Sequence, residues 1–307
     1  MNRSPVKGKI LVIRGGAIGD FILTLPAIAA LRQQFPDAQL EVLGYPHIAQ
    51  LALAGGLVDR VQPIEARALA GFFARNGELS EDLRDYFSEF NIIVSYLYDP
   101  DAIFQANILR CAHGQFLVGP HRPDEAQRVH ATEVYLKPLE RLAIFAADPV
   151  PRLSLHTTRP PRPALALHPG SGSERKNWPE AKWAELLQRL IESTSLQLLL
   201  IGGEAEGRRL EDLAKLLPGE RHAVAKNLPL RELAERLRTC AAFVGHDSGI
   251  THLAAAVGLP TLVLWPHTDV DIWRPQGGHV RILRDKNGLP LLSVQAVTEE
   301  LRALLPL

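Results

Sequence analysis

Three short polar segments are notable because each directly follows an apolar run. They cover residues 15–20 (GGAIGD), 168–178 (HPGSGSERKNW) and 245–252 (GHDSGITH), and they combine glycine with carboxylate, hydroxyl, imidazole and ammonium groups. In open parallel α/β sheets, ligands bind outside the carboxyl ends of the strands. If each apolar run is a strand, the three segments lie where a substrate binds.

Asp20 stands at the start of a helical pattern, directly after a glycine turn. A carboxylate there is favoured by the helix dipole and can simply cap the helix. The alternative is a general base, with Gly15, Gly16 and Gly19 allowing a substrate close to the backbone. The turn fails the dinucleotide fingerprint, because Ala17 and Asp20 occupy positions that require glycine, so NAD binding is disfavoured.

Residues 168–178 bring glycines, serines and a lysine together before a helix that begins near residue 179. Backbone N–H groups, small hydroxyls and a cation on one loop can cradle a phosphate. The spacing is not that of a P-loop. A polar loop without a ligand is the alternative for this segment taken alone.

In residues 245–252, Asp247 or Ser248 can cap the helix that follows. The same helix start would offer free N–H groups and a partial positive charge to a diphosphate. His252 lies one turn further on and could reach the same anion, although a lone histidine is more often a packed or solvated side chain.

Metal and hydrolase signatures are weak in this chain. The D-x-D strings at residues 99–101 and 269–271 are interpreted as loop residues. The 11 histidines show no H-E-x-x-H spacing, and the G-x-S-x-G elbow is missing from the sequence. We therefore predict no required metal.

The elements that must position these segments follow a strand–helix alternation. Apolar runs typical of buried parallel strands occupy residues 9–13, 40–43, 92–96, 164–167, 197–201, 241–245 and 261–265. Prolines crowd residues 149–163, which suits a linker. We expect an α/β chain with a Rossmann-like domain over residues 1–150, a linker over 151–163, a second such domain over 164–290 and a C-terminal helix within 291–307.

Composition supports a globular two-domain protein. The chain has 307 residues, 46% of them hydrophobic, and equal numbers of basic and acidic residues. A zero net charge disfavours nucleic-acid binding through phosphates. Residues 1–150 hold 14 basic and 17 acidic residues, whereas residues 151–307 hold 20 and 17, so an anionic ligand is expected on the second domain. Two distant cysteines and no export or membrane-spanning pattern suggest the reducing cytosol.

Together, in order, the motifs resemble those of the heptosyltransferase family, glycosyltransferase family 9, of bacterial lipopolysaccharide synthesis. The resemblance spans essentially the whole chain and rests on Gly19-Asp20 with Leu25-Pro26, on HPG with KNW between residues 168 and 178, and on GHDSGITH. It implies a GT-B fold, two Rossmann-like domains facing across a cleft. It also implies inverting, metal-independent transfer from a nucleotide sugar, usually ADP-heptose, to a lipopolysaccharide-type saccharide or glycolipid, with no cofactor beyond that co-substrate.

Position by position, the resemblance makes Asp20 the catalytic base. It assigns the donor phosphates, sugar, ribose and adenine to Ser171, Ser173, Lys176, Asp247, Ser248, Gly249, His252, Glu204 (ribose) and Leu228 (adenine). The acceptor-side loop is Arg14, Gly15, Gly16 and Gly19, and Arg14, Arg60 and Arg122 could form a local anion site. The expected location is the cytoplasm, with transient contact between residues 69–75 and the inner face of the inner membrane.

Other interpretations remain open on the sequence alone. The same fold could use another nucleotide sugar, or could be a sugar-nucleotide epimerase, which would need more than one acid or base and no acceptor. A non-catalytic nucleotide-sugar-binding protein could keep the donor motif and lose Asp20. The presence of both favours the enzyme.

Overall fold

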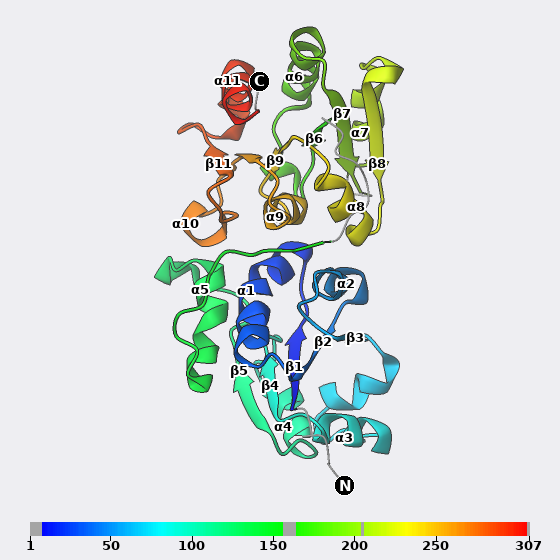
Figure 1. The fold of residues 1–307 in the computed structure, drawn as a ribbon, viewed down its shortest axis with the longest axis vertical. Helices are drawn as coiled ribbons and strands as arrows, with labels where there is room; N and C mark the ends of the chain where they lie inside the picture. The colour runs from blue at the N-terminus through cyan, green and yellow to red at the C-terminus, as the bar shows by residue number, and fades with distance from the viewer. Residues whose placement is uncertain (1–7, 156–163, 204–205, 306–307) are drawn as a thin grey trace. The chain divides into compact units, whose positions relative to one another are not determined.

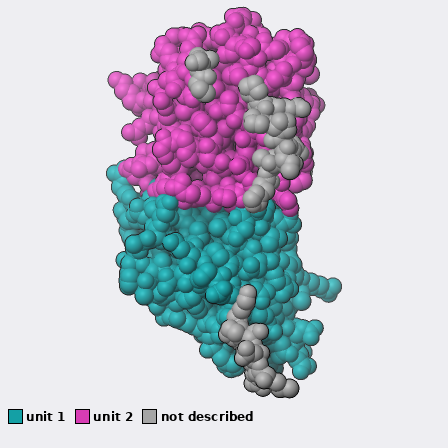
Figure 2. Space-filling view, in the orientation of Figure 1, with its two compact units in different colours: residues 1–149 teal, residues 150–307 magenta. Residues whose placement is uncertain are grey.

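The computed structural model of the chain describes residues 8–155, 164–203 and 206–305. The chain divides into two compact units, Met1–Pro149 and Val150–Leu307 (Figure 2). Glu204 and residues 156–163 of the expected linker lie outside the described residues. Residues 151–155 belong to unit 2, where Leu153 and Leu155 are buried and the Leu153 N–H donates to the Ala256 carbonyl at 2.8 Å.

Unit 1 has a parallel sheet with strand order β3-β2-β1-β4-β5 in its described part (Figure 1). The strands are β1 (Lys9–Arg14), β2 (Gln39–Gly44), β3 (Arg60–Pro63), β4 (Ile92–Ser95) and β5 (Gln115–Val118). The helices and 3₁₀ segments are α1 (Ile18–Gln34), α2 (Pro46–Ala54), η1 (Arg67–Phe73), α3 (Glu81–Ser88), α4 (Ile103–Leu109), η2 (Glu125–Gln127), α5 (Ala131–Leu136) and η3 (Lys137–Leu142). The carboxyl ends of β1, β4 and β5 therefore share one edge.

The centre of unit 1 is β1 with the helix that follows it. Residues 10–13 of β1 are apolar and fully buried because β2 and β4 flank the strand and helices cover both faces. α1 is buried along most of its length and packs on α5. A rigid strand and a buried helix thus hold the Gly15–Gly16 turn between them.

Unit 2 repeats this design with strand order β11-β10-β9-β6-β7-β8 in its described residues. The strands are β6 (Ala164–His168), β7 (Gln197–Gly202), β8 (His222–Lys226), β9 (Ala242–His246), β10 (Thr261–Leu264) and β11 (Val280–Leu283). The helices and 3₁₀ segments are η4 (Glu174–Lys176), α6 (Glu180–Ser193), α7 (Gly207–Lys215), η6 (Gly219–Arg221), α8 (Leu230–Leu237), α9 (Gly249–Ala256), α10 (Val270–Trp273), η7 (Leu289–Leu291) and α11 (Val294–Leu304).

The core of unit 2 joins strand side chains to α6 and to the end of the chain. Trp178, Trp183 and the inner face of α11 are buried with leucines of β6, β7 and β10. The Ser293 hydroxyl caps α11, the predicted C-terminal helix, by accepting from the Ala296 N–H at 3.2 Å. Helix α11 is therefore an integral part of unit 2.

The α/β class with two parallel-stranded units is confirmed. β6 and β9 are neighbours in the sheet, so the two polar segments that follow them lie side by side. Within the part of the chain that the structure describes, no helix has both the length and the hydropathy of a membrane-spanning segment.

Candidate functional site

The turn after β1 is built over a buried guanidinium. Arg14 is the last residue of β1, and its side chain lies under the turn. Its NH1 group donates to the carbonyls of His121 (2.9 Å) and Tyr96 (3.3 Å), and its NH2 group donates to the Asp20 carbonyl (3.2 Å). The guanidinium also stacks 4.7 Å from the Tyr135 ring centroid. Arg14 thus ties the start of α1 to the segments that follow β4 and β5, and its side chain is buried.

Asp20 lies on the first turn of α1 with its carboxylate one-third exposed. Oδ2 accepts from the Ala17 N–H at 3.1 Å, which confirms the capping role, and Oδ1 lies 3.9 Å from Arg14 NH2. Gly16 has a φ of 101°, and a Cβ there would sit 3.0 Å from Asp20 Oδ2. The glycine turn therefore makes room for this carboxylate, and Asp20 keeps Oδ1 free of backbone capping.

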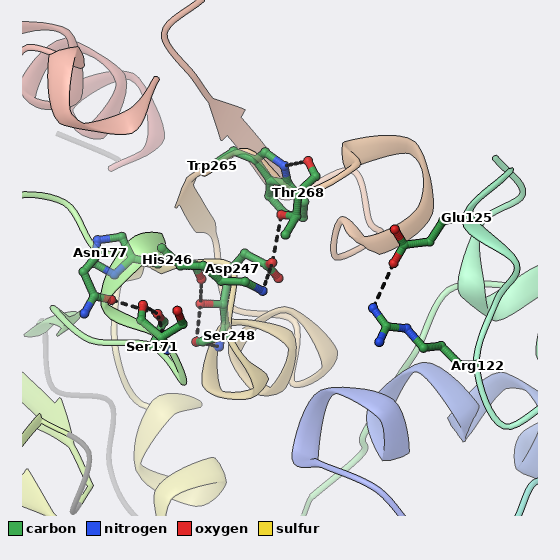
Figure 3. A network of polar contacts seen from close by, with 12 residues as sticks. Arg122, Glu125, Ser171, Asn177, His246, Asp247, Ser248, Trp265 and Thr268 are labelled. Carbon is green, nitrogen blue, oxygen red and sulfur yellow. Dashed lines mark hydrogen bonds and ion pairs between the residues drawn. The ribbon is translucent and has the colours of Figure 1, made fainter. Parts of the chain in front are cut away.

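The expectation of one anion site from three arginines is wrong for Arg60. Arg60 begins β3 and pairs with the buried Glu41 at 3.5 Å. In this parallel sheet Glu41 is level with Leu11, whereas Arg14 is level with Gly44, so Arg60 lies toward the amino ends of the strands. Arg122 follows β5 and pairs with Glu125 at 2.8 Å (Figure 3).

In unit 2, the loop after β6 is clamped at both ends by His246, the last residue of β9. The imidazole Nε2 accepts from the Trp178 N–H at 2.9 Å, so Nδ1 carries the proton and donates to the Gly170 carbonyl at 3.2 Å. His246 is fully buried against the Trp183 ring, and burial lowers its pKa to about 3. The ring is neutral at physiological pH, which preserves both hydrogen bonds.

The cation of this loop pairs with the carboxylate that follows β9. Lys176 Nζ lies 2.7 Å from Asp247 Oδ2, which also accepts from the Thr268 hydroxyl at 2.9 Å. The Thr268 carbonyl in turn accepts from the Trp265 indole N–H at 2.8 Å (Figure 3). Asp247 is nearly buried, whereas Lys176 is about one-third exposed. The ammonium group is thereby held in place with part of its surface open to a ligand.

Ser248 caps α9, as the sequence predicts for this segment, and faces a buried histidine. Its Oγ accepts from the Thr251 N–H at 3.3 Å and lies 3.3 Å from His168 Nδ1. His168 Nε2 lies 3.6 Å from the buried Glu206 carboxylate, and burial lowers the pKa of His168 to about 4. A Cβ on Gly170 would lie 2.0 Å from Glu206 Oε1, so the glycine leaves room for the Glu206 side chain in its present position.

The other predicted donor residues lie on the same edge of the sheet. Ser171 is buried, with Oγ 2.8 Å from both the Ser173 carbonyl and Asn177 Oδ1, whereas Ser173 is exposed. Gly249 begins α9 and His252 is buried one turn later. Leu228 is half-buried just after β8, whose last residue pairs with the end of β7. Glu204 is outside the described residues.

Sequence reasoning assigned no individual role to His168, His246, Glu206 or Thr268, although both histidines lie within the motifs that it singled out. Thr268 could have been found, because it follows β10 at the edge where ligands bind. The two D-x-D strings have structural roles, as expected: Asp99 accepts from the Phe104 and Gln105 N–H groups, and Asp269 caps α10. Among the described residues, no three His, Cys, Asp or Glu side chains form a group that could hold a metal ion.

Chains of known proteins resemble this one over most of its length. Lipopolysaccharide heptosyltransferase 1 of Pseudomonas aeruginosa is 27% identical over 289 residues, covering 85% of this chain and 79% of that protein. Lipopolysaccharide heptosyltransferase 1 of Salmonella typhimurium is 26% identical over 298 residues, covering 85% of this chain and 89% of that protein.

Solved structures share the whole fold. A glycosyltransferase family 9 protein from Veillonella parvula superposes with a TM-score of 0.79 at 16% identity over 99% of both chains. Escherichia coli heptosyltransferase WaaC, solved with ADP, gives 0.76 at 20% identity over 96% of this chain and 99% of that one. These similarities confirm the GT-B fold expected from the sequence.

The sequence profile of glycosyltransferase family 9 (heptosyltransferase) matches residues 131–300. The match includes the His246 clamp, the Lys176–Asp247 pair and the capped start of α9. With this match over more than half its length, the chain belongs to glycosyltransferase family 9, the heptosyltransferases.

Proposed function

We propose that this glycosyltransferase moves a heptose from ADP-heptose to a lipopolysaccharide-type saccharide, with inversion, without a metal ion and with Asp20 as general base. The observation that carries the proposal is the Asp20 carboxylate, exposed above the buried Arg14 cation at the carboxyl end of the central strand of unit 1. The names of the relatives in family 9 give heptose as the transferred sugar and lipopolysaccharide as the acceptor class, and the similar Escherichia coli WaaC was solved with ADP.

In the proposed reaction, a hydroxyl oxygen of the acceptor attacks the anomeric carbon of the heptose. The new carbon–oxygen bond forms as the bond from that carbon to the β-phosphate oxygen breaks, and its electron pair leaves with ADP. Asp20 takes the hydroxyl proton. Attack opposite the leaving group inverts the anomeric centre.

Positive charge for the departing ADP would come from the protein. The Lys176 ammonium has three N–H bonds, so it can keep its contact with Asp247 and still donate to a phosphate. The N-terminus of α9 adds backbone N–H groups and the positive end of the helix dipole. Metal independence rests on these groups.

The proposed location is the cytoplasmic face of the inner membrane, where a nucleotide sugar could meet a glycolipid. In the segment suggested for surface contact, Leu69 and Phe72 are buried in the core of unit 1. Contact through residues 69–75 would therefore rely on the exposed Phe73 and Arg75.

The test is calorimetric titration of the protein with ADP, UDP and GDP in the presence of a chelator. A transfer assay from ADP-heptose to O-deacylated lipopolysaccharide of a heptose-deficient strain follows. Selective binding of ADP and metal-free transfer are expected. Preference for UDP or GDP would overturn the donor assignment, and conversion of ADP-heptose without acceptor would indicate epimerase chemistry instead.

A further inference from the structure

Two exposed aromatic rings contact each other beside the Asp20 turn, with their planes tilted by 59°. Tyr98 follows β4 and is 67% exposed. Its ring centroid lies 4.6 Å from that of His121, which follows β5 and is also exposed. Both residues extend from the carboxyl edge of the sheet, which Asp20 also occupies.

Arg14 connects these rings to Asp20 through a single rigid group. Its NH1 atom donates to the backbone carbonyl of His121 at 2.9 Å, and its NH2 atom donates to the backbone carbonyl of Asp20 at 3.2 Å. Because a guanidinium is planar and its N–H directions are fixed, the His121 and Asp20 backbones keep a constant separation.

The loops that carry the rings are held firmly as well. The Asp99 carboxylate, next to Tyr98, accepts from the Phe104 and Gln105 N–H groups at 3.2 and 2.9 Å. Gly119, two residues before His121, is packed so tightly on the Tyr96 ring that a Cβ would lie 2.5 Å from it. The pair is therefore preformed, and a ligand would not have to order it.

We propose that Tyr98 and His121 form a platform that binds a pyranose ring of the acceptor saccharide. The face of an aromatic ring carries negative charge density, which attracts the weakly positive C–H bonds on one face of a sugar. The tyrosine hydroxyl and the imidazole nitrogens at the rim can bond the sugar hydroxyls.

The assignment to the acceptor rests on the proposed function, in which Asp20 takes the proton of the acceptor hydroxyl. A sugar that gives its proton to Asp20 must lie against the turn that the platform adjoins. Phe145 is a contrasting case: it is 74% exposed in unit 1 but follows η3, and none of the Arg14 hydrogen bonds reaches it. It provides the matched control.

The experiment measures direct binding of O-deacylated lipopolysaccharide, and of its lipid-free oligosaccharide, by saturation-transfer NMR and calorimetry. Tyr98→Ala is expected to weaken binding of both ligands about tenfold, while Tyr98→Trp restores it and Phe145→Ala leaves it unchanged. In the transfer assay, Tyr98→Ala should raise the acceptor KM and leave the donor KM and the ADP affinity as they are.

The platform is overturned if the wild-type protein binds neither ligand, or if Tyr98→Ala binds the oligosaccharide as well as wild type. Binding that requires the lipid portion and ignores Tyr98 would also overturn it. Tyr98-dependent binding of the oligosaccharide without any heptose transfer would keep the platform and refute the proposed function. The two ideas therefore fail separately.

Discussion

The turn after β1 and the loop after β6 each contribute to an ion pair, and the two pairs differ in which partner is buried. In unit 1 the cation is inside: the Arg14 side chain is 2% exposed and the Asp20 carboxylate 33%. In unit 2 the anion is inside: Asp247 is 9% exposed and Lys176 is 30%. The partner that faces solvent determines the chemistry that each turn can perform.

In each pair, the buried partner orients the exposed one but leaves part of its hydrogen-bonding capacity available. Arg14 is committed to three carbonyls, so its contact with Asp20 Oδ1 is long, at 3.9 Å. The Thr268 hydroxyl fixes the Asp247 carboxylate. That carboxylate accepts one of the three N–H bonds of the Lys176 ammonium and leaves the other two available. Unit 1 presents a negative group and unit 2 a positive group, which suits the proposed proton removal and diphosphate binding.

Removing the outer charge of unit 1 should have the largest effect. Asp20→Asn keeps a side-chain oxygen to cap α1 but cannot take a proton, so we expect turnover to fall about a hundred- to ten-thousand-fold, the usual contribution of a general base. Calorimetry should find ADP affinity unchanged. The control is Asp37→Asn, an exposed aspartate after α1. Near wild-type turnover in Asp20→Asn would leave Asp20 as a cap alone.

Removing the outer charge of unit 2 should act on binding. Lys176→Met is expected to weaken ADP about ten- to a hundredfold, the range of a hydrogen bond to a charged group. The variant also leaves Asp247 buried and unpaired, so Lys176→Met with Asp247→Asn should regain stability but not ADP affinity. Lys215→Met removes an exposed lysine paired with Asp212 and serves as control. Equal ADP affinity in Lys176→Met would refute the phosphate role.

The His246 clamp should have a smaller, graded effect on the same loop. His246→Gln can still accept from the Trp178 N–H but loses the bond to Gly170, and His246→Phe loses both. At about 1 kcal/mol per hydrogen bond, ADP affinity should fall roughly fivefold for each bond lost. The control is His279→Gln, because His279 bonds the Ala255 carbonyl at the far end of α9. Unchanged affinity in His246→Phe would show that the loop keeps its shape without the clamp.

Acid should weaken unit 2 gradually. Burial lowers the pKa of His168 to about 4 and of His246 to about 3, from an ordinary value of 6.5. Below pH 6.5 and above the lowered pKa values, these histidines bind protons in the unfolded chain but not in the folded one. The free energy of unfolding therefore falls as the pH drops from 6.5 toward 4. All four tryptophans lie in unit 2, so their fluorescence reports its unfolding alone. His246→Phe should show a shallower pH dependence, and an identical slope would contradict this account.

Central elements were predictable from the sequence, and edge elements were not. β1, β6 and β9 are continuous apolar runs because they are buried on both faces. β3, β5, β8 and β11 are missing from the predicted strands. Each lies near an edge of its sheet and mixes exposed polar residues with apolar ones, as in RVQP and HAVAK. Short strands of this kind lack a periodic signal.

The features of the site that depend on residues close together in sequence were predictable. The glycine turn, the Ser248 cap and the α6 start follow from neighbours in sequence. The role of Arg14 depends on a carbonyl 107 residues away, and the His246 clamp joins atoms 68 and 76 residues apart. Such contacts depend on the order of the strands in the sheet, and the spacing of residues along the chain does not give that order.

The pairing of β6 with β9 also sets the order in which the protein can assemble during synthesis. β7 and β8 are made between these two strands but lie on the far side of β6. The loop after β6 therefore leaves the ribosome long before the histidine that clamps it, while every strand of unit 1 has already been made. A chain interrupted before residue 242 would carry the complete Asp20 turn, but its loop after β6 would lack the His246 clamp. Nascent chains would thus expose the proposed base before the proposed donor-binding loop has its final shape.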